Sequence, residues 1–284
     1  MTANTAQKAS AEQFLALHHS RRPFVLGNCW DVVTAALFER EGFRAIGTSS
    51  YATAATLGLN DGEHIALQET VDLVRRLTRR VKVPVSADIE TGYAETIDGV
   101  VQSARAVLAA GAVGINIEDS TGDPERPLSD LTLQCEKIAA IRAMTNEAGF
   151  HPVINARTDV YLLANGNARL RLREAIDRGR AYAKAGADCV FVPDMGDLDA
   201  AMMRQLVSEI GAPINIVAGA STPPMAKLEE IGIVRVSLGP RVMRAALGLF
   251  RGIAREILDL GTFAKMTAGA LSYEETNRLL ADRT

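Results

Sequence analysis

Residues 107–119 read VLAAGAVGINIED, which is the end of a helical pattern, a glycine, and a short run rich in Val and Ile. The same phrase recurs as FEREGFRAIGTSS at 38–50, YAKAGADCVFVPD at 182–194 and LEEIGIVRVSLGP at 228–240. In each copy the glycine stands where a helix C-cap favours positive φ. The apolar runs are continuous, as in parallel strands that helices cover on both faces. The sequence therefore predicts repeated helix–strand units around a parallel sheet.

Three further strands are each introduced by a proline: PVSAD at 84–88, PVINAR at 152–157 and PINIV at 213–217. With FVLGN at 24–28, we expect eight strands with a helix between each pair. Eight such units in 284 residues are typical of a (β/α)8 TIM-type barrel. A doubly wound nucleotide-binding sheet is disfavoured because the chain has no G-x-G spacing and no Gly-Lys pair. We expect residues 1–284 to form one barrel domain, with residues 259–284 as an extra helical tail.

Composition excludes several classes of function. The formal net charge is −3, which gives no electrostatic footprint for nucleic acid and no steering toward an anionic membrane. The first residues lack the apolar core of a signal peptide, and no apolar run is long enough to span a bilayer. Three scattered cysteines do not form a disulfide framework. We therefore expect a cytoplasmic protein with a small-molecule partner.

Three acids follow neighbouring strands at the end of a barrel where active sites lie. Asp88 and Glu90 are two residues apart, so they are expected to point to the same side of the sheet, and Glu118 ends the next strand. Converging carboxylates repel one another unless a cation lies between them, and hard oxygen ligands suit Mg²⁺ or Mn²⁺. We predict a divalent metal site here. The alternative is that these acids cap helices or pair with arginines.

Arg157 is expected to stand almost opposite these acids, where its guanidinium suits capture of a carboxylate or phosphate. The alternative is a structural ion pair with Asp159 or Glu118. The turn at 48–51 offers hydroxyl and N–H groups for a second anionic group, although such a turn is often only a loop. None of the histidines has ligand spacing, and no G-x-S-x-G motif is present, so zinc and acyl-enzyme chemistry are disfavoured.

At these residues the sequence resembles the isocitrate lyase/phosphoenolpyruvate mutase superfamily over nearly the whole chain. The segment ADIETGY at 87–93 is similar to the family's D-x-[DE]-x-G-Y metal segment, and IED at 117–119 to its I-E-D strand end. The segment NCWD at 28–31 is similar to its first strand end. SSY at 49–51 with LGLND at 57–61 is similar to its substrate-carboxylate turn and the acid that follows.

The resemblance implies a barrel in which Mg²⁺ binds a 2-oxo or 2-hydroxy acid and stabilises an enolpyruvate-like oxyanion. It implies Asp88, Glu90 and Glu118 as metal residues. It implies Asp61, Arg157 and Tyr51 as catalytic residues. The expected substrate-binding residues are Trp30, Ser49, Ser50, Tyr51, Arg157 and Asn215. It also implies a homotetramer in which a terminal helix is exchanged between subunits.

The chain departs from the family at one loop. Family C–C lyases carry K-[KR]-C-G-H after the fourth strand, whereas residues 120–128 read STGDPERPL, without Cys, His or Lys. The loop asparagine of the phosphonate-rearranging members is also missing. We therefore expect an Mg²⁺-dependent C–C lyase of the carboxy-lyase or oxo-acid-lyase type, with decarboxylation of an oxaloacetate-type acid favoured. The alternatives are phosphonopyruvate P–C bond chemistry, with Thr121 or water as acceptor, and a non-catalytic 2-oxo-acid binder.

Overall fold

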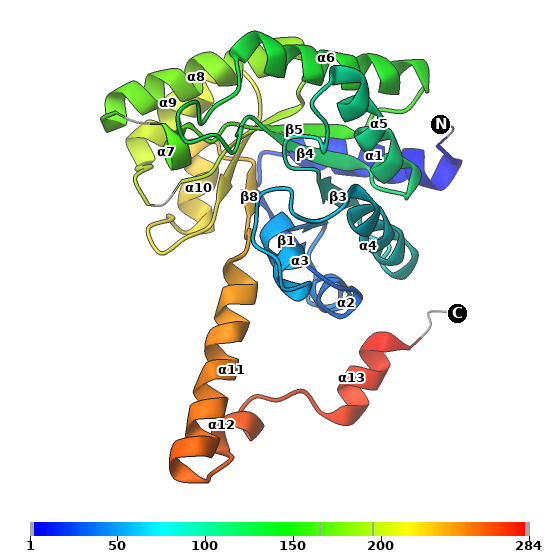
Figure 1. Ribbon diagram of the computed structural model, residues 1–284, viewed down its shortest axis with the longest axis vertical. Helices are drawn as coiled ribbons and strands as arrows, with labels where there is room; N and C mark the ends of the chain where they lie inside the picture. Colours follow the sequence, from blue (N-terminus) through cyan, green and yellow to red (C-terminus); the bar gives the residue numbers. More distant parts are fainter. Residues whose placement is uncertain (1–2, 165, 195, 282–284) are drawn as a thin grey trace.

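The computed structural model describes residues 3–164, 166–194 and 196–281. Its strands close into a parallel barrel in the order β1 to β8, as the repeated phrase predicted (Figure 1). The strands are β1 Phe24–Cys29, β2 Ile46–Thr48, β3 Val85–Asp88, β4 Gly114–Glu118, β5 Val153–Arg157, β6 Cys189–Val192, β7 Ile214–Val217 and β8 Arg235–Ser237. β8 pairs with β1, so the barrel has no free edge.

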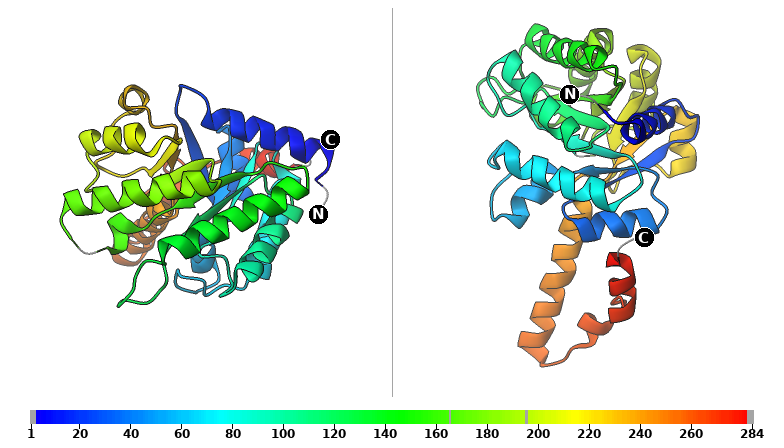
Figure 2. Two further views of the ribbon diagram at one scale, coloured as in Figure 1. Left: turned by 90° about the horizontal axis from the view of Figure 1, so that it is seen from above. Right: turned by 90° about the vertical axis from the view of Figure 1, so that its right-hand side faces the viewer.

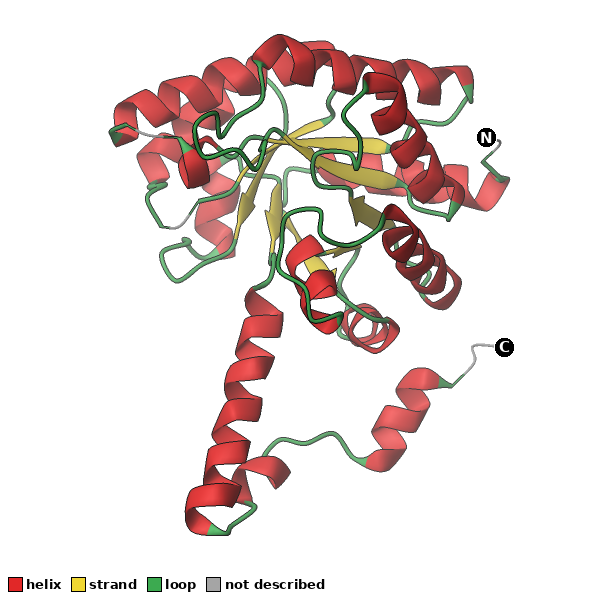
Figure 3. Ribbon diagram, viewed as in Figure 1, coloured by secondary structure: helices red, strands yellow, loops and turns green. Residues whose placement is uncertain are grey.

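Helices surround the strands, as Figure 3 shows in red around yellow. They are α1 Thr5–His18, α2 Val32–Arg40, α3 Ser50–Thr56, α4 Leu67–Arg80, α5 Ile97–Ala109, α6 Leu131–Glu147, α7 Val160–Leu163, α8 Ala168–Ala185, α9 Ala200–Ile210, α10 Met225–Ile231, α11 Arg241–Leu260, α12 Ala264–Thr267 and α13 Tyr273–Leu280. The expected glycine stops are present: Gly186 caps α8 at φ 114° and Gly232 caps α10 at φ 96°. No helix in the described ranges is long and apolar enough to cross a membrane.

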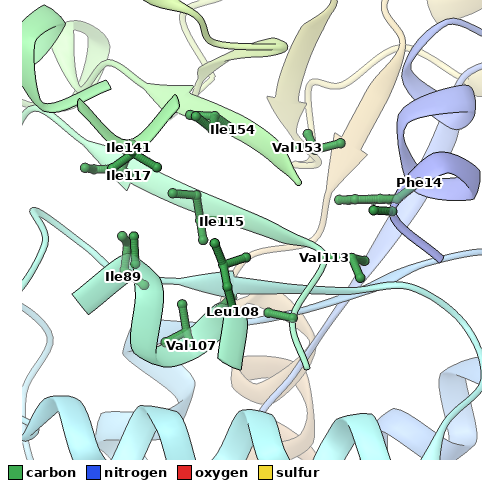
Figure 4. Close-up of a cluster of buried hydrophobic side chains, with 14 of the residues drawn as sticks. Phe14, Ile89, Val107, Leu108, Val113, Ile115, Ile117, Ile141, Val153 and Ile154 are labelled. Atoms are coloured by element: carbon green, nitrogen blue, oxygen red, sulfur yellow. The ribbon is translucent and has the colours of Figure 1, made fainter. Parts of the chain in front are cut away.

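The side chains of strand β4 alternate between the helix-covered outside of the barrel and its interior. Ile115 and Ile117 are fully buried and pack with Leu108 and Ile141 of the covering helices (Figure 4). The alternate residue Asn116 turns into the barrel, where its Nδ2 donates to Asp88 Oδ1 at 3.0 Å. Period-2 alternation thus places apolar side chains under the helices and polar ones inside the barrel. The barrel interior is the polar compartment.

Helix α1 closes the end of the barrel opposite the strand carboxyl ends. Phe14 is fully buried, and a Cβ on Gly114 would lie only 2.6 Å from its ring. His18 and Phe24 pack edge-on around that ring, with centroids 4.7 and 6.2 Å from it. Because this aromatic plug fills one end, the barrel interior is entered from the other.

The C-terminal region stands away from the barrel. In Figure 1, α11 extends outward and α12 and α13 return toward α2; Figure 2 shows the same separation from the side. Arg40 Nη1 donates to the Glu275 carbonyl at 3.4 Å, which ties α13 to α2. The protruding segment includes α11 as well as the described part of the expected tail, up to residue 281, because α11 continues as one helix through Leu260. Subunit exchange of this tail stays a prediction.

Candidate active site

A cavity of about 200 Å³ opens at the carboxyl ends of the strands. The predicted residues that line it are Ser49, Ser50, Tyr51, Asp61, Asp88 and Arg157. Trp30, Asn215, Glu90 and Glu118 lie outside its wall. Asn215 is fully buried and donates from Nδ2 to Ser237 Oγ at 3.0 Å, so it braces β7 against β8. The structure therefore brings together the serine turn, two of the acids and the arginine.

Asp88 is the acid that most contacts converge on. Its backbone N–H donates to Thr48 Oγ1 at 2.8 Å, and the Ser50 N–H approaches its Oδ2 at 3.3 Å. Asn116 supplies the bond to Oδ1 described above. These contacts come from β2, the start of α3 and β4, so the last residue of β3 is held from both neighbouring strands. Its carboxylate faces the cavity in a fixed orientation.

Asp61 joins Asp88 from the loop that follows α3. Partial burial and, next, the nearby Asp88 carboxylate raise the pKa of Asp61, while a hydrogen bond from the Ser50 side chain lowers it. Both acids line the cavity. A carboxyl group whose pKa is raised by a neighbouring carboxylate marks a place where a cation is stabilised.

Glu90 does not lie on β3, which corrects the expectation that it would share a strand face with Asp88. β3 ends at Asp88, and Glu90 has φ 49°, in the left-handed region. Glu90 is not part of the cavity wall, and its carboxylate accepts from the Glu63 N–H at 2.6 Å and from the Tyr93 hydroxyl at 3.3 Å. Burial first, and then Asp88, raise the pKa of Glu90 to about 7.

Glu63 clamps this turn. Its Oε1 accepts from the Thr91 N–H at 2.7 Å, the Thr91 hydroxyl at 2.5 Å and the Tyr93 N–H at 3.1 Å. Glu63, Glu90 and Tyr93 are the non-glycine residues with positive φ in the described ranges, and all belong to this one junction. Backbone strain of this kind persists where surrounding contacts enforce it, typically at functional sites. The clamp holds the loop that carries Asp61 against the end of β3.

Arg157 forms a buried ion network rather than a free anion clamp. Its Nη1 lies 2.6 Å from Glu118 Oε2, and its Nε and Nη2 donate to Asp159 at 2.6 and 2.9 Å. This is the structural alternative that the sequence left open, with both proposed partners engaged. Burial raises the pKa of Glu118, and the Arg157 charge opposes that rise. Glu118 Oε1 also accepts from the Ser120 hydroxyl at 2.7 Å.

The family model for phosphoenolpyruvate phosphomutase matches residues 14–258. The chain belongs to this family. An uncharacterized protein of Mycobacterium tuberculosis (strain ATCC 25618 / H37Rv) is 35% identical over 269 residues, covering 95% of this chain and 96% of the relative. The 2-methylisocitrate lyase of Aeropyrum pernix is 29% identical over 239 residues, covering 82% and 75%. The predicted superfamily is confirmed.

Solved structures agree with the family and its barrel. A Burkholderia cenocepacia J2315 protein superimposes with a TM-score of 0.90 at 33% identity, covering 98% of both chains. Phosphonopyruvate hydrolase in complex with oxalate and Mg²⁺ superimposes with a TM-score of 0.82 at 25% identity, covering 99% of this chain and 95% of the other. The relatives named above include a lyase and a hydrolase, so the family fold supports more than one reaction.

The family's metal can be tested against these side chains. The predicted cluster of Asp88, Glu90 and Glu118 is not formed: no group of three or more metal-ligand side chains meets within the described ranges. Glu90 accepts from the Glu63 N–H outside the cavity wall, and Glu118 pairs with Arg157. Asp88 and Asp61 remain as cavity-lining oxygen donors, and the negative charge around Asp88 raises the pKa of its neighbours. A hard divalent cation fits this donor set, with water completing its shell.

Three cations that line the cavity were not predicted from the sequence. Arg235 comes from β8, and Arg241 and Arg244 come from the first turn of α11. The sequence does single out Arg235, because it is a charged residue inside the apolar run IVRVS at 233–237. The alternation of β8 could have placed it in the barrel, as it does for Ser237 two residues later.

Removing the Glu63 clamp should weaken metal binding. We expect Glu63→Ala to lower Mg²⁺ affinity about tenfold. Residues that do not touch the metal but hold its ligands in place typically change metal affinity by that order. Glu63→Gln keeps one oxygen acceptor and should stay within about threefold of the wild type. Titration calorimetry measures both, with the exposed Glu69→Ala as control. Equal affinities for the alanine and glutamine variants would show that the clamp does not position Asp61.

The raised pKa of Glu90 predicts a pH-dependent stability of the metal-free protein. Its pKa is about 7 in the folded state against an ordinary value of 4.5, so the folded protein keeps this proton where the unfolded chain releases it. The stabilisation is therefore present at low pH and is lost as pH rises through about 7. We expect Tm to fall between about pH 5 and pH 8, and Glu90→Gln to flatten the fall. Thermal melts in a chelator test this, and identical profiles for both proteins would contradict it.

Proposed function

We propose that the protein is an Mg²⁺-dependent C–C lyase that acts on a small 2-oxo or 2-hydroxy acid through an enolate, with an oxaloacetate-type acid as the favoured substrate. The observation that carries this proposal is the cavity at the barrel mouth, where Asp88 and Asp61 stand beside the Ser49–Ser50 turn. Membership of the phosphoenolpyruvate phosphomutase family supports it.

Asp88 and Asp61 are the residues that would hold the metal. Mg²⁺, when bound, supplies positive charge that stabilises an enolate oxygen. Ser49 and Ser50 line the same cavity and can donate to oxygens of the acid. Tyr51 is 37% exposed at the mouth, so its hydroxyl can exchange a proton with solvent. The Arg157 network keeps β4 and β5 in register beneath these groups.

The loop at 120–128 favours decarboxylation over reactions that need a proton donor at this place. It contains no Cys, His or Lys. Its one short bridge pairs Ser120 with Leu128, and the Thr121 hydroxyl donates to the Arg126 carbonyl at 2.5 Å. Carbon dioxide departs without a proton, so water or Tyr51 is sufficient to quench the enolate. Phosphonopyruvate hydrolysis is the second candidate, supported by the Variovorax sp. phosphonopyruvate hydrolase at 27% identity over 295 residues.

Product analysis separates these reactions. Purified protein with Mg²⁺ is incubated with oxaloacetate or with phosphonopyruvate, and pyruvate and inorganic phosphate are measured against enzyme-free mixtures. Enzyme-dependent pyruvate from oxaloacetate supports the carboxy-lyase. Phosphate from phosphonopyruvate alone supports the hydrolase. Binding of both acids without product would leave a 2-oxo-acid binder.

We expect the 120–128 loop to act as a lid that excludes water. Deleting residues 122–126 should lower kcat/KM by on the order of a hundredfold, because closing lids sequester such intermediates. Glu125→Ala and Arg126→Ala should change kcat/KM less than about threefold, since both are exposed and neither supplies a proton. Steady-state kinetics test this. Loss of turnover with retained binding in Glu125→Ala would identify a catalytic acid instead.

We also propose a cytoplasmic homotetramer in which α11 is exchanged between subunits. The support is apolar surface along the protruding segment: Leu249 is 59%, Phe250 70% and Leu258 84% exposed. Exposed apolar patches of this kind mark protein contacts. Sedimentation equilibrium measures the assembly, and a monomer at micromolar concentration would contradict it.

A further inference from the structure

Arg235 lies at the floor of the cavity, above the aromatic plug. It is 2% exposed, it lines the cavity, and its Cζ is 5.8 Å from the centroid of the Phe14 ring. Phe14 and α1 close the barrel below it. The guanidinium is therefore shielded from bulk water on one side and faces the enclosed cavity on the other.

This buried cation has no carboxylate partner. No ion pair reaches Arg235 within the described ranges, and neither its Nε nor its Nη1 has a hydrogen-bond partner there. Burial lowers the pKa of Arg235 to about 10, and Cys189 and Asp88 only partly oppose that effect. A buried charge without a partner destabilises a fold. An anion bound beside the guanidinium would offset that cost.

Arg157 shows the contrast. It also lines the cavity, but its guanidinium is already paired with two carboxylates, those of Glu118 and Asp159. Arg235 lines the same cavity without such an ion pair in the described part of the chain, so its charge is available to a bound anion.

Ser86 lies next to the same space. Its side-chain Oγ is buried without a hydrogen-bond partner in the described part of the chain. A Cβ on Gly114 would lie 3.2 Å from this oxygen and 2.6 Å from the Phe14 ring, which places Ser86 at the level of the plug. Ser86 and Arg235 both line the cavity. The floor thus offers one cation and one hydroxyl, and neither has a hydrogen-bond partner in the described part of the chain.

We propose that Arg235 and Ser86 form an anion subsite at the cavity floor that binds a carboxylate of the substrate. The inference rests on the proposed function in taking the ligand to be a small 2-oxo acid. The bound carboxylate is the one that stays on the enolate. A guanidinium stabilises a carboxylate over neutral carbon dioxide, so holding the departing group here would slow its loss. The departing group instead faces the mouth.

Pyruvate and its neutral amide, pyruvamide, test the subsite because they share shape and differ in charge. With Mg²⁺ present, titration calorimetry should show the wild type binding pyruvate at least tenfold more tightly than pyruvamide. Arg235→Met should weaken pyruvate binding at least tenfold and change pyruvamide binding less than twofold, in line with loss of a charged hydrogen bond. Arg173→Met, an exposed arginine of α8 that is not part of the cavity wall, is the matched control and should keep the preference.

Melting temperature separates a binding role from a structural one. Methionine replaces an unpaired buried charge with an apolar side chain, so Arg235→Met should melt at or above the wild-type temperature. If that variant does not fold, Arg235→Lys takes its place and should keep at least a threefold preference for pyruvate. An unchanged preference in Arg235→Met, parallel loss of both ligands, or no preference in Arg235→Lys would overturn the subsite.

The two proposals fail in different ways. Arg235-dependent binding of pyruvate without turnover of any 2-oxo acid would contradict the proposed lyase activity and support the anion subsite. Turnover of oxaloacetate with wild-type kcat/KM in Arg235→Met would contradict the anion subsite and support the proposed lyase activity.

Discussion

Asp88→Asn is expected to reduce kcat/KM by on the order of 10²–10³, with a matching loss of Mg²⁺ affinity. Asp88 is the cavity acid on which contacts from two neighbouring strands converge, so asparagine keeps the shape and removes the charge. Calorimetry gives the metal affinity and steady-state kinetics give kcat/KM. The exposed Asp98→Asn on α5 is the matched control and should behave as the wild type.

Two outcomes would contradict this expectation directly. If Asp88→Asn binds Mg²⁺ with wild-type affinity, the cation does not sit between Asp88 and Asp61. If metal binding is lost and turnover is kept, the reaction does not need a metal at this site.

Arg157→Met is expected to lower the free energy of unfolding by about 3–5 kcal/mol, because it leaves two buried carboxylates without their cation. For a chain of this size each kcal/mol lowers Tm by about 2–4 °C. Arg157→Lys keeps the charge and loses the two-pronged contact with Asp159, so its loss should be smaller, although kcat/KM should still fall strongly.

Urea denaturation and thermal melting measure these losses. Arg173→Met is the control, since its ion pair with Asp177 is exposed and should be worth less than about 1 kcal/mol. A Tm for Arg157→Met within a degree or two of the control would show that the network does not stabilise the fold.

The barrel was predictable because its signals are local. In four places a helix, a glycine stop such as Gly186 and a buried strand appear together within about a dozen residues, and eight strands in all leave few ways to close the sheet. The protrusion of α11 was not predictable in the same way. Its apolar residues are typical of a helix that packs against another surface. The sequence does not say whether that surface is the barrel of the same chain.

The site was predictable to the level of strand ends and no further. The alternation of side chains along β3 predicts that Asp88 faces the barrel interior. The alternation ends with the last strand residue, so it does not predict the left-handed turn at Glu90. The pairing of Arg157 with Glu118 depends on the register of β4 against β5, which places these two residues side by side. The isolation of Arg235 needs the positions of all surrounding acids, which no local pattern contains.

The most direct test of a Mg²⁺-dependent carboxy-lyase is pyruvate formation from oxaloacetate as a function of Mg²⁺ concentration, with enzyme-free mixtures at each concentration as reference. We expect an enzyme-dependent rate that saturates with Mg²⁺, falls to the reference in a chelator and returns when Mg²⁺ or Mn²⁺ is restored. An enzyme-dependent rate that is the same in the chelator, or no rate above the reference at any Mg²⁺ concentration, would contradict it.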